Sequence, residues 1–585
     1  MDMGSCRFLK AFGIAVFALH CYLCHAEKAP CYSFVKEAIA APRVSYHDYI
    51  VVGGGTAGCP LAATLSETAN VLVLERGGSP YRKPGETDKG NFFLTLLDPS
   101  PDSYAQTFVT EDGVYNQRAR VLGGGTVINA GFYSHAEPEF VKASGLDEAL
   151  VNDSYRWVEK KVVFEAPVSQ WQSAVRDGLT EAGVLPFNGV TYDHINGTKT
   201  GSTIFDMDDH RHSAADLLEY ADPNNIKVYL HATVHKIILT TENVRSRPKA
   251  EGVIFEDASG VRHTALLNKS SKSEIIVSAG AIGSSQLLML SGIGPADQLE
   301  ELGIKLVMDQ PMVGQGMGDS TFNGLFIPSP TPVELSLISA VGIYLPASYI
   351  EAASGFNMTP SFDSNTEFLL RILNQVFTFY FIALQTAVIY NSVDCLTMVV
   401  VVACVTDVQT NIGPRLNGGT IFQKVARPLS RGYIELRSTD PNETPRVRFN
   451  YFKEPADLKR CVQGMQTIIN VINSKAFSKF RFPTISTQSL LNLMAASASN
   501  LRPRNPNTAT SLKQFCNDTV TTLWHHHGGC RVGKVVDNEY RVLGVDGLRV
   551  IDASTFSFSP GTNPQATVMM LGRAMGVQIQ KDRHS

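Results

Sequence analysis

The sequence lacks an excess of charge of either sign. Its 51 lysines and arginines nearly balance 55 aspartates and glutamates, and charged residues make up 18% of the 585 positions. Without a basic excess, nothing indicates binding to nucleic acid. The chain also lacks an internal repeat of about 20 to 50 residues, which argues against a solenoid or a propeller. A chain of this length is too long for one compact core, so we expect two to four domains.

Cysteine is sparse as well. Among the ten cysteines, no C-x-x-C pair is joined by a second pair at the spacing of a zinc site, so we expect no metal centre. Three cysteines fall in the first 26 residues. The remainder are an odd number, too few for a disulfide scaffold, although an oxidising compartment would permit one or two bridges that the sequence alone does not assign. They are Cys31, Cys59, Cys395, Cys404, Cys461, Cys516 and Cys530.

Residues 1–26 have the features of a secretory signal peptide. Arg7 and Lys10 form a basic start, residues 11–23 are largely apolar, and residues 24–26 offer small side chains at the cleavage-determining positions. A membrane anchor is the alternative, but the apolar run is short for a span. Six N-x-S/T sequons follow, as expected of a secreted glycoprotein. Their asparagines are Asn152, Asn196, Asn268, Asn357, Asn442 and Asn517.

After a short leader, residues 27–46, the sequence predicts a strand–helix–strand unit. Residues 49–52 and 71–74 are apolar runs typical of buried strands, and residues 60–67 between them have a helical pattern. Glu75 ends the second run, where a carboxylate would accept hydrogen bonds from a ribose diol and disfavour a 2′-phosphate. NADP is therefore not expected.

Glycines fill the turn after the first of these strands. Gly53, Gly55 and Gly58 occupy the positions of a G-x-G-x-x-G motif, which permits a tight turn and a close approach of the backbone to a pyrophosphate. The N-terminus of the following helix would attract the phosphates. The whole unit predicts FAD or NAD, and a glycine-rich turn without a ligand is the alternative.

A second glycine-rich stretch lies in residues 118–132. Three successive glycines, residues 123–125, are flanked by apolar residues and are followed by Asn129-Ala130-Gly131. Such a run suggests that the backbone closely approaches something flat or phosphorylated. A hairpin turn explains the glycines equally well.

Further along the chain, apolar patterning predicts strands and helices. We expect antiparallel strands at 226–230, 234–239, 252–255 and 261–267, forming a sheet beside the parallel one. A buried strand is expected at 274–280, followed by a helix at 284–290. Ser213 is a plausible cap for another helix. Later elements are strands at 432–437 and 446–451, a helix at 457–473 that carries Cys461, and a C-terminal helix ending near Ile579.

Residues 361–412 do not match the rest of the chain. Between Ile372 and Thr406 the only charge is Asp394, which is compatible with a membrane helix. Polar residues interrupt the run and its β-branched and aromatic residues suit strands, so no stable membrane span is expected. A buried sheet segment and a stretch foreign to the ancestral fold, such as an altered exon boundary, are the other two interpretations.

Near the C-terminus, three adjacent histidines, His525 to His527, mark a candidate metal-binding or catalytic site. Consecutive residues of an extended segment point to opposite faces, so the three rings are not expected to converge on one metal ion. One histidine acting as a general base is the preferred interpretation, because imidazole titrates near neutrality. Histidines that only pack or face solvent are the alternative.

With these motifs the sequence resembles the glucose–methanol–choline (GMC) oxidoreductases, a family of FAD flavoproteins, over nearly all of the chain except residues 361–412. The strand–helix–strand unit, residues 119–132, residues 280–294 and the C-terminal histidines carry the resemblance. The sequence is most similar to plant members, the HOTHEAD-like proteins and the (R)-mandelonitrile lyases. The resemblance implies an α/β fold in which a Rossmann-like FAD-binding domain (46–130, 200–310 and 520–585) is interleaved with a substrate domain built on an antiparallel sheet (131–199 and 311–519).

The resemblance also implies roles for individual residues. His525 would be the catalytic base and Asn563 its partner, and Cys461 and Cys516 resemble a pair that is bridged in the plant lyases. The pyrophosphate would contact Thr56 and Ala57 beside the glycine turn. Glu75 and Arg76 would contact the adenosine end of the cofactor, and the backbone of Val234 would hold the adenine. The remaining residues expected around the flavin are Val121, Gly125, Asn129, Ala130, Gly131, Phe132, Trp524, His525, Asp552, Ala553, Asn563, Pro564 and Gln565.

Two positions bear on the reaction. The lyases carry a histidine where Asn563 stands and a cysteine at about the position of Glu351. Both departures favour oxidation of an alcohol, with hydride transfer to FAD, and the resemblance to HOTHEAD-like proteins suggests a long-chain hydroxy fatty acid. A lyase that acts on a cyanohydrin and keeps FAD without redox chemistry is one alternative. A flavoprotein inactivated by the 361–412 stretch is the other.

Overall fold

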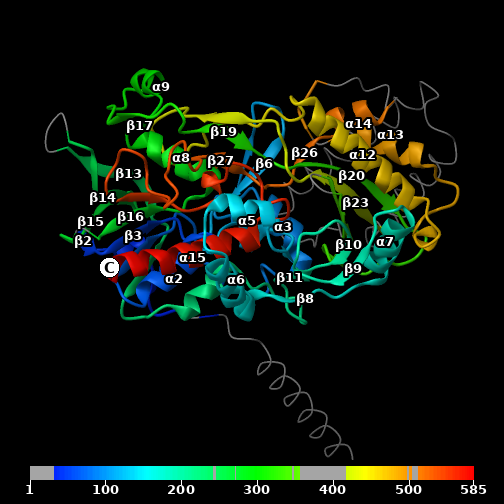
Figure 1. Cartoon of the computed structure of the whole chain (residues 1–585), viewed down its shortest axis with the longest axis horizontal. Helices are drawn as coiled ribbons and strands as arrows, with labels where there is room; N and C mark the ends of the chain where they lie inside the picture. Colours follow the sequence, from blue (N-terminus) through cyan, green and yellow to red (C-terminus); the bar gives the residue numbers. More distant parts are fainter. Residues whose placement is uncertain are drawn as a thin grey trace, which may run out of the picture.

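The computed structural model describes residues 30, 32–241, 246–270, 272–344, 348–355, 417–496, 498, 500–503 and 511–584. Two large sheets organise these residues, and they occupy opposite sides of the molecule (Figure 1). The arrangement confirms the predicted α/β fold class. The predicted signal peptide and residues 361–412 lie outside the described residues.

The first sheet has six strands, and every neighbouring pair is parallel. In spatial order they are β1 (Val35–Glu37), β12 (Ile226–Leu230), β4 (Val71–Leu74), β3 (Tyr49–Val52), β16 (Glu274–Val277) and β28 (Leu548–Val550). Every residue of β3 and β4 is buried, as expected for a parallel sheet covered on both faces.

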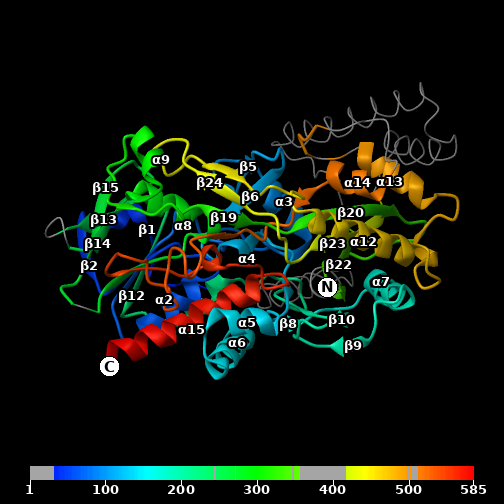
Figure 2. The same cartoon turned by 45° about the horizontal axis from the view of Figure 1, so that its top comes forward.

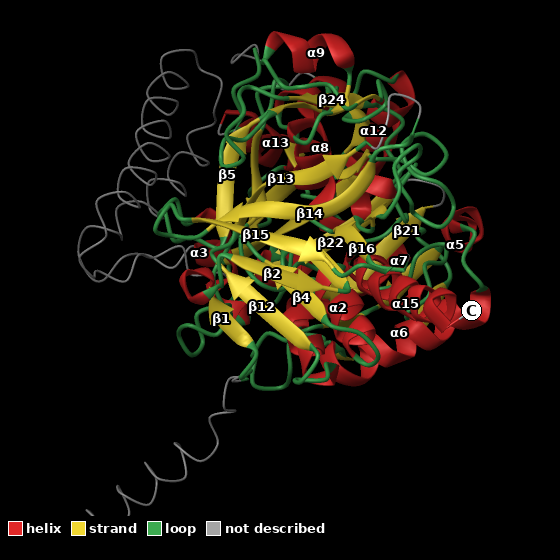
Figure 3. Ribbon diagram, turned by 90° about the vertical axis from the view of Figure 1, so that its left-hand side faces the viewer, coloured by secondary structure: helices red, strands yellow, loops and turns green. Residues whose placement is uncertain are grey.

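Helices cover one face of this sheet and a second, smaller sheet covers the other. Helix α2 (Gly58–Ser66) packs against α15 (Gln565–His584), which also contacts α6 (Glu148–Val162) (Figure 2). On the opposite face lie β13 (Thr233–Thr240), β14 (Lys249–Glu256) and β15 (Arg262–Leu267), joined by β2 (Val44–His47) (Figure 3). The glycine turn between β3 and α2 thus opens at the carboxyl end of the strands, where ligands of such sheets bind.

Two predictions about these sheets were wrong. The strand at 226–230 does not join the antiparallel set but pairs in parallel with β4, Val228 opposite Val73. The chain turns at His231, which has a positive φ of 52°, and re-enters the smaller sheet as β13. Residues 27–46 are also more than a leader, because β1 and β2 extend the two sheets. Strands of three or four residues are too short to give a periodic signal.

The second large sheet has seven strands, which pair antiparallel except for the last two. In order they are β26 (Thr521–Thr522), β20 (Thr321–Pro328), β23 (Gly418–Val425), β22 (Ser348–Ser354), β21 (Ala340–Tyr344), β10 (Gly197–Thr200) and β9 (Phe187–Val190). Helices α7 (Gln170–Glu181) and α12 (Pro455–Ile472) pack on one face of this sheet. Its other face carries Lys424, which contacts Asn563 just before α15. The domain boundaries proposed from the sequence stay a prediction.

Several smaller elements complete the frame. The predicted helix at 457–473 is confirmed as α12. Ser213 caps a helix as predicted, by accepting a hydrogen bond from the amide of Ala215, but that helix is the 3₁₀ helix η3 (Ala214–Tyr220). Helix α8 (Gly280–Leu290) begins four residues earlier than predicted. Other elements used below are the hairpin of β5 (Ala105–Val109) and β6 (Tyr115–Ala119), α4 (Gly125–Ile128), β19 (Gln315–Gly318), β24 (Gly432–Glu435), β25 (Arg446–Arg448), α14 (Leu512–Asp518), β27 (His527–Gly529) and η6 (Ala553–Thr555). Among the described residues, no helix is long and apolar enough to cross a membrane.

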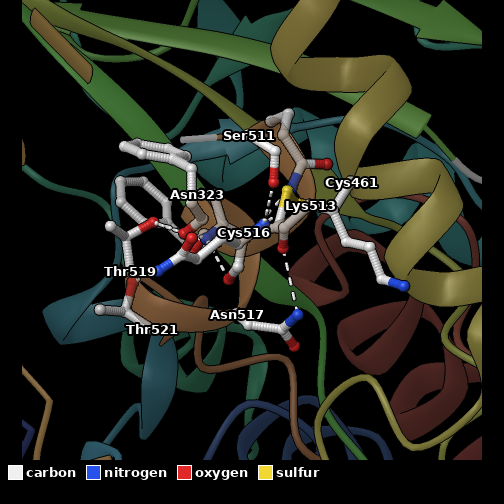
Figure 4. Close-up of a disulfide and its surroundings, with 12 residues drawn as sticks. Asn323, Cys461, Ser511, Lys513, Cys516, Asn517, Thr519 and Thr521 are labelled. Carbon is white, nitrogen blue, oxygen red and sulfur yellow. Dashed lines mark hydrogen bonds between the residues drawn. A yellow bond between two sulfur atoms is a disulfide. The ribbon is translucent and has the colours of Figure 1, made fainter. Parts of the chain in front are cut away.

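One disulfide, Cys461–Cys516, joins α12 to α14 and confirms the pairing implied by the resemblance (Figure 4). Nearby, the amide of Asn323 donates to the Cys516 carbonyl at 3.0 Å and to the Thr519 hydroxyl at 2.9 Å, which links the bridge to β20. The cross-link therefore fastens the helical layer to the seven-stranded sheet.

Replacing both cysteines of this bridge by alanine should lower the stability of the protein. The bridge closes a loop between positions 55 residues apart, and cross-links of that kind contribute about 2–4 kcal/mol, mainly by restricting the unfolded chain. The urea midpoint of the double variant, followed by tryptophan fluorescence, should fall below that of the oxidised protein. Adding a reductant should shift the midpoint of the wild type but not of the variant, and equal midpoints for the two oxidised proteins would contradict the prediction.

Candidate active site

The two glycine-rich stretches of the sequence meet at the carboxyl end of the parallel sheet. The amide of Gly123 donates to the carbonyl of Gly54 at 2.7 Å. A Cβ atom on Gly58 would lie 2.0 Å from the carbonyl oxygen of Gly53, and one on Gly124 would lie 2.8 Å from the Cα of Gly55. No other residue fits such contacts. The second stretch is therefore not a hairpin turn but the partner of the first, and together they form a cradle of backbone amides suited to a pyrophosphate.

Glu75 stands beside this cradle, buried at the end of β4. Its two carboxylate oxygens accept hydrogen bonds from the amides of Gly54 (3.0 Å) and Gly77 (2.8 Å), and burial raises the pKa of the carboxyl. Each oxygen keeps a further lone pair, as an acceptor for a ribose hydroxyl requires. The carboxylate thus fits the adenosine half of a dinucleotide.

Arg76, in contrast, is engaged within the protein. Its guanidinium donates to the Gln106 side chain at 2.8 Å and to the Ala119 carbonyl at 3.2 Å, and burial lowers its pKa to about 10. These bonds tie β4 to the β5–β6 hairpin. The cofactor contacts of Arg76, of Thr56 and Ala57 in the turn, and of Val234 at the start of β13 stay predictions.

Residues expected to line the flavin come together from distant parts of the chain. Asn129 donates to Gln565 at 2.8 Å, and Gln565 donates in turn to the Phe132 carbonyl at 2.7 Å. The amide of Gly131 donates to the Asn129 side chain at 2.9 Å. These bonds fix the start of α15, with Pro564, against residues 129–132, and an apolar cluster that includes Val121 packs with Ala130 and Trp524 beside them.

Asp552 follows β28 and caps a helix. Its carboxylate accepts hydrogen bonds from the amides of Gly280 (2.9 Å) and Ser554 (2.7 Å) and from the Ser284 hydroxyl (2.5 Å), and burial raises its pKa. The bonds explain why α8 begins at Gly280, a position the apolar pattern did not reveal. They also hold Ala553, the first residue of η6, at the carboxyl end of the parallel sheet.

His525 sits on a tightly held turn between β26, an edge strand of the seven-stranded sheet, and β27. Buried Asp319 accepts hydrogen bonds from the His525 amide (2.9 Å), the Thr522 hydroxyl (2.7 Å) and the Tyr451 hydroxyl (2.6 Å). Trp524, just before the histidine, has a positive φ of 60°, a strained conformation for a bulky residue. Such strain persists only where the surroundings enforce it, and it is found preferentially at functional sites.

The three adjacent histidines have different partners. His526 contacts the Asn116 side chain at 2.8 Å and stacks on Phe449, whereas the ring of His527 contacts the His525 carbonyl at 3.0 Å. The Nδ1 atom of His525 is buried and has no hydrogen-bond partner among the described residues. Within that part of the chain, no group of three metal-binding side chains is present. Nε2 of His527 is likewise buried without a partner there, but that ring is bonded through its Nδ1 atom, so His525 is the one of the three rings for which the described residues provide no hydrogen-bond partner.

A buried lysine that the sequence analysis did not single out bonds to Asn563 and acts on His525 through its charge. Lys424 on β23 donates to Asn563 Oδ1 at 2.5 Å and to Glu351 Oε1 at 2.9 Å, and its ammonium lies 3.9 Å from the centre of the Tyr349 ring. Burial lowers the pKa of His525 well below its usual value, and the charge of Lys424 lowers it further. In the sequence Lys424 stands between Gln423 and Val425, and no local pattern marks it as a site residue.

The arrangement favours removal of a proton from a neutral hydroxyl group. His525 is neutral around pH 7 and so can act as a base. The amide of Asn563 and the ammonium of Lys424 supply hydrogen-bond donors and positive charge where an alkoxide would form. The glycine cradle and Glu75 place a dinucleotide cofactor at the same end of the parallel sheet.

Comparisons with known proteins identify the family of this chain. Sequence profiles described as GMC oxidoreductase match residues 47–321 and 428–572. The chain is 47% identical to Protein HOTHEAD of Arabidopsis thaliana, with 92% of this chain and 89% of that one covered. It is 43% identical to an Arabidopsis thaliana protein named (R)-mandelonitrile lyase-like (94% and 92% covered) and 41% identical to Sinalpyl alcohol oxidase Nec3 of Nesocodon mauritianus (92% and 89% covered).

Solved structures agree on the fold. Formate oxidase of Aspergillus oryzae superposes with a TM-score of 0.69 at 18% identity, with 93% of this chain and all of that one covered. The glycine cradle and the buried carboxylate fit FAD, the cofactor of this family. The chain therefore belongs to the GMC oxidoreductase family, whose members are FAD-dependent enzymes that act on CH–OH donors.

Proposed function

We propose that the protein oxidises an alcohol, with His525 as the general base and Asn563 as a hydrogen-bond donor to the substrate oxygen. The observation that carries this proposal is that Lys424, whose charge helps to keep His525 neutral, also donates to the amide oxygen of Asn563, while Nδ1 of His525 has no hydrogen-bond partner among the described residues. A neutral imidazole can accept the hydroxyl proton, and a carboxamide can only donate to, not protonate, the resulting alkoxide.

FAD, when bound, would accept the hydride from the alcohol carbon. The protein's part is to hold the reactants and to manage the proton and the charge. General-base assistance by His525 is typically worth about 10² to 10⁴ in rate. A donor such as Asn563 adds roughly 3 kcal/mol of stabilisation of the developing alkoxide, by analogy with oxyanion-hole donors.

For the substrate we propose a long-chain hydroxy fatty acid. The support is the 47% identity to Protein HOTHEAD, together with the resemblance of the sequence to HOTHEAD-like proteins. The 41% identity to a protein named Sinalpyl alcohol oxidase supports the broader class, an alcohol.

A hydroxynitrile lyase is the second candidate, because the relatives include a protein named (R)-mandelonitrile lyase-like at 43% identity. Against it, this chain has Asn563 in place of the second histidine, and Glu351 pairs with buried Lys424. A lyase would release cyanide from mandelonitrile without reducing FAD. A protein that does neither would be the inactive flavoprotein.

We also propose that the protein is secreted and glycosylated. The disulfide suits an oxidising compartment, and Asn152, Asn196 and Asn442 are exposed in N-x-S/T sequons. When the full chain is produced in plant cells, we expect it in the medium, with a mass that falls after treatment with an N-glycosidase. Intracellular protein of unchanged mass would contradict the proposal.

Replacing His525 by glutamine should slow reduction of the flavin about 10² to 10⁴-fold, because the hydroxyl proton then lacks its acceptor. The measurement is anaerobic bleaching of the bound flavin with ω-hydroxy fatty acids, benzyl alcohol and mandelonitrile, each added separately. His526→Gln is the control variant. Its ring contacts Asn116, so this change should leave the flavin content as in the wild type. Cyanide release without bleaching would select the lyase, and a His525→Gln variant reduced at the wild-type rate would exclude this base.

The pH dependence of flavin reduction should reveal the lowered pKa of His525. Burial and then Lys424 favour the neutral ring, so the active base form persists below the usual titration range of a histidine. We expect kcat/KM to stay level as the pH falls from 8 through about 6.5 and to decline only at lower pH. A decline centred at pH 6.5, with the protein still folded by circular dichroism, would show that His525 titrates as an ordinary exposed histidine.

A further inference from the structure

Lys424 is a buried charge for which the fold alone gives no reason. Both Lys424 and its ion-pair partner Glu351 are 0% exposed. A buried ion pair rarely stabilises a protein more than apolar side chains of similar size would. The pair therefore points to a role other than stability.

The antiparallel pairing of β22 and β23 gathers the groups around this lysine on one face of the sheet. Tyr349 lies directly opposite Lys424, and Glu351 opposite Phe422, so these side chains project to the same side. Gln423, the intervening residue, projects to the other side, where its amide bonds with Asn323 and α12 packs. The face with Lys424 is the one that borders Asn563.

The ammonium of Lys424 determines which way the amide of Asn563 is turned. An ammonium can only donate, so the Asn563 atom 2.5 Å from Lys424 Nζ must be the oxygen. The amide group is planar, and its two N–H groups consequently point away from the lysine. Among the described residues, nothing accepts a hydrogen bond from Asn563 Nδ2, and the side chain is half-buried. The donors are thus free for a ligand.

We propose that Lys424 is a positioning residue for the oxidation: by bonding to Oδ1 of Asn563 it fixes both N–H donors of that amide toward the substrate oxygen. Glu351 balances the lysine's charge and keeps it in place. The inference rests on the proposed function, and it makes the pair of Lys424 and Asn563, rather than Asn563 alone, the group that meets the alkoxide.

The charges around the lysine are compatible with this role. Burial lowers the pKa of Lys424, and Glu351 opposes that effect. The lysine in turn acts on two neighbouring histidines. Burial and then the charge of Lys424 lower the pKa of His525, and burial, Lys199 and then Lys424 lower the pKa of His194, which stacks on Tyr349. Lys199 also faces this region, but its ammonium is held by Ser134 and by three backbone carbonyls. Lys424 is the cation bonded to Asn563.

The test is a double-mutant cycle on the flavin-loaded enzyme. Lys424→Met and Asn563→Ala should each lower the limiting rate of flavin reduction by about 10²-fold, the usual effect of losing one such donor. If Lys424 acts through Asn563, the double variant should be slower than the worse single variant by less than about threefold. Independent losses that multiply to about 10⁴, or an unchanged rate in Lys424→Met, would overturn the proposal.

Two further readouts separate positioning from a structural effect. In Lys424→Met the limiting rate should fall while the half-saturating alcohol concentration changes by less than about threefold, because the interaction strengthens only as the alkoxide forms. The acid limb of its pH profile should also move up toward 6.5, since a positive charge near His525 is lost. Gln423→Met is the matched control: it removes a buried polar group of the same strand on the opposite face and should keep the wild-type rate.

A double-mutant cycle on melting temperature tests the contact between Lys424 and Asn563 even if no alcohol reduces the flavin of the wild type. Asn563→Asp places a carboxylate against the Lys424 ammonium, so it should cost little melting temperature in the wild-type background and several degrees in the Lys424→Met background, where the buried charge is unpaired. Equal losses in both backgrounds would overturn the contact. Unequal losses in the two backgrounds, in a protein whose flavin no alcohol reduces, would support the contact and contradict the proposed oxidation.

Discussion

The close contact of two glycine turns is the constraint on which the rest of the structure depends. With a Cβ position on Gly58 only 2.0 Å from the Gly53 carbonyl, α2 can approach β3 only through glycine. The hydrogen bond from Gly123 to Gly54 then fixes the start of α4 and the chain toward Asn129. Helix α15 closes over the same point, because a Cβ on Gly572 would lie 2.3 Å from the Ala57 carbonyl. The glycine cradle and helix α15 are therefore one assembly.

Buried carboxylates position the segments that do not contact the glycine turns. Asp552 holds the N-terminus of α8, and Asp319 holds the strained turn that presents His525. Burial raises the pKa of both groups, and the hydrogen bonds that they accept work against that rise. Each carboxylate thus links segments far apart in the chain by satisfying amides and hydroxyls that would otherwise be buried without partners.

The seven-stranded sheet supplies the positive charge that lies against Asn563. Its strands β22 and β23 carry Glu351, Tyr349 and Lys424 on one face, directly against Asn563. A histidine in place of Asn563 would meet the same ammonium with a group that can itself carry a positive charge. The carboxamide is the better partner for a fixed cation, because it is neutral and has an oxygen to offer.

The sequence by itself determined the cofactor unit. The glycine spacing, the two apolar strands and Glu75 are all local, since each depends on residues adjacent in the chain, and the structure has them where the pattern indicates. Helix α12 was likewise recognisable from its own periodicity. The resemblance to a known family added the disulfide and the choice of His525 and Asn563, which no local pattern contains.

Only the tertiary structure decided how those residues are used. Strand 226–230 joined the parallel sheet because the edge of β4 was available to it, a fact that its own sequence does not encode. The sequence analysis passed over Lys424, because its partners Glu351 and Asn563 lie 73 and 139 residues away and are brought to it only by the register of β22 and β23 and the start of α15. Periodicity reports which face of an element is buried, whereas the partner across that face is set by long-range packing.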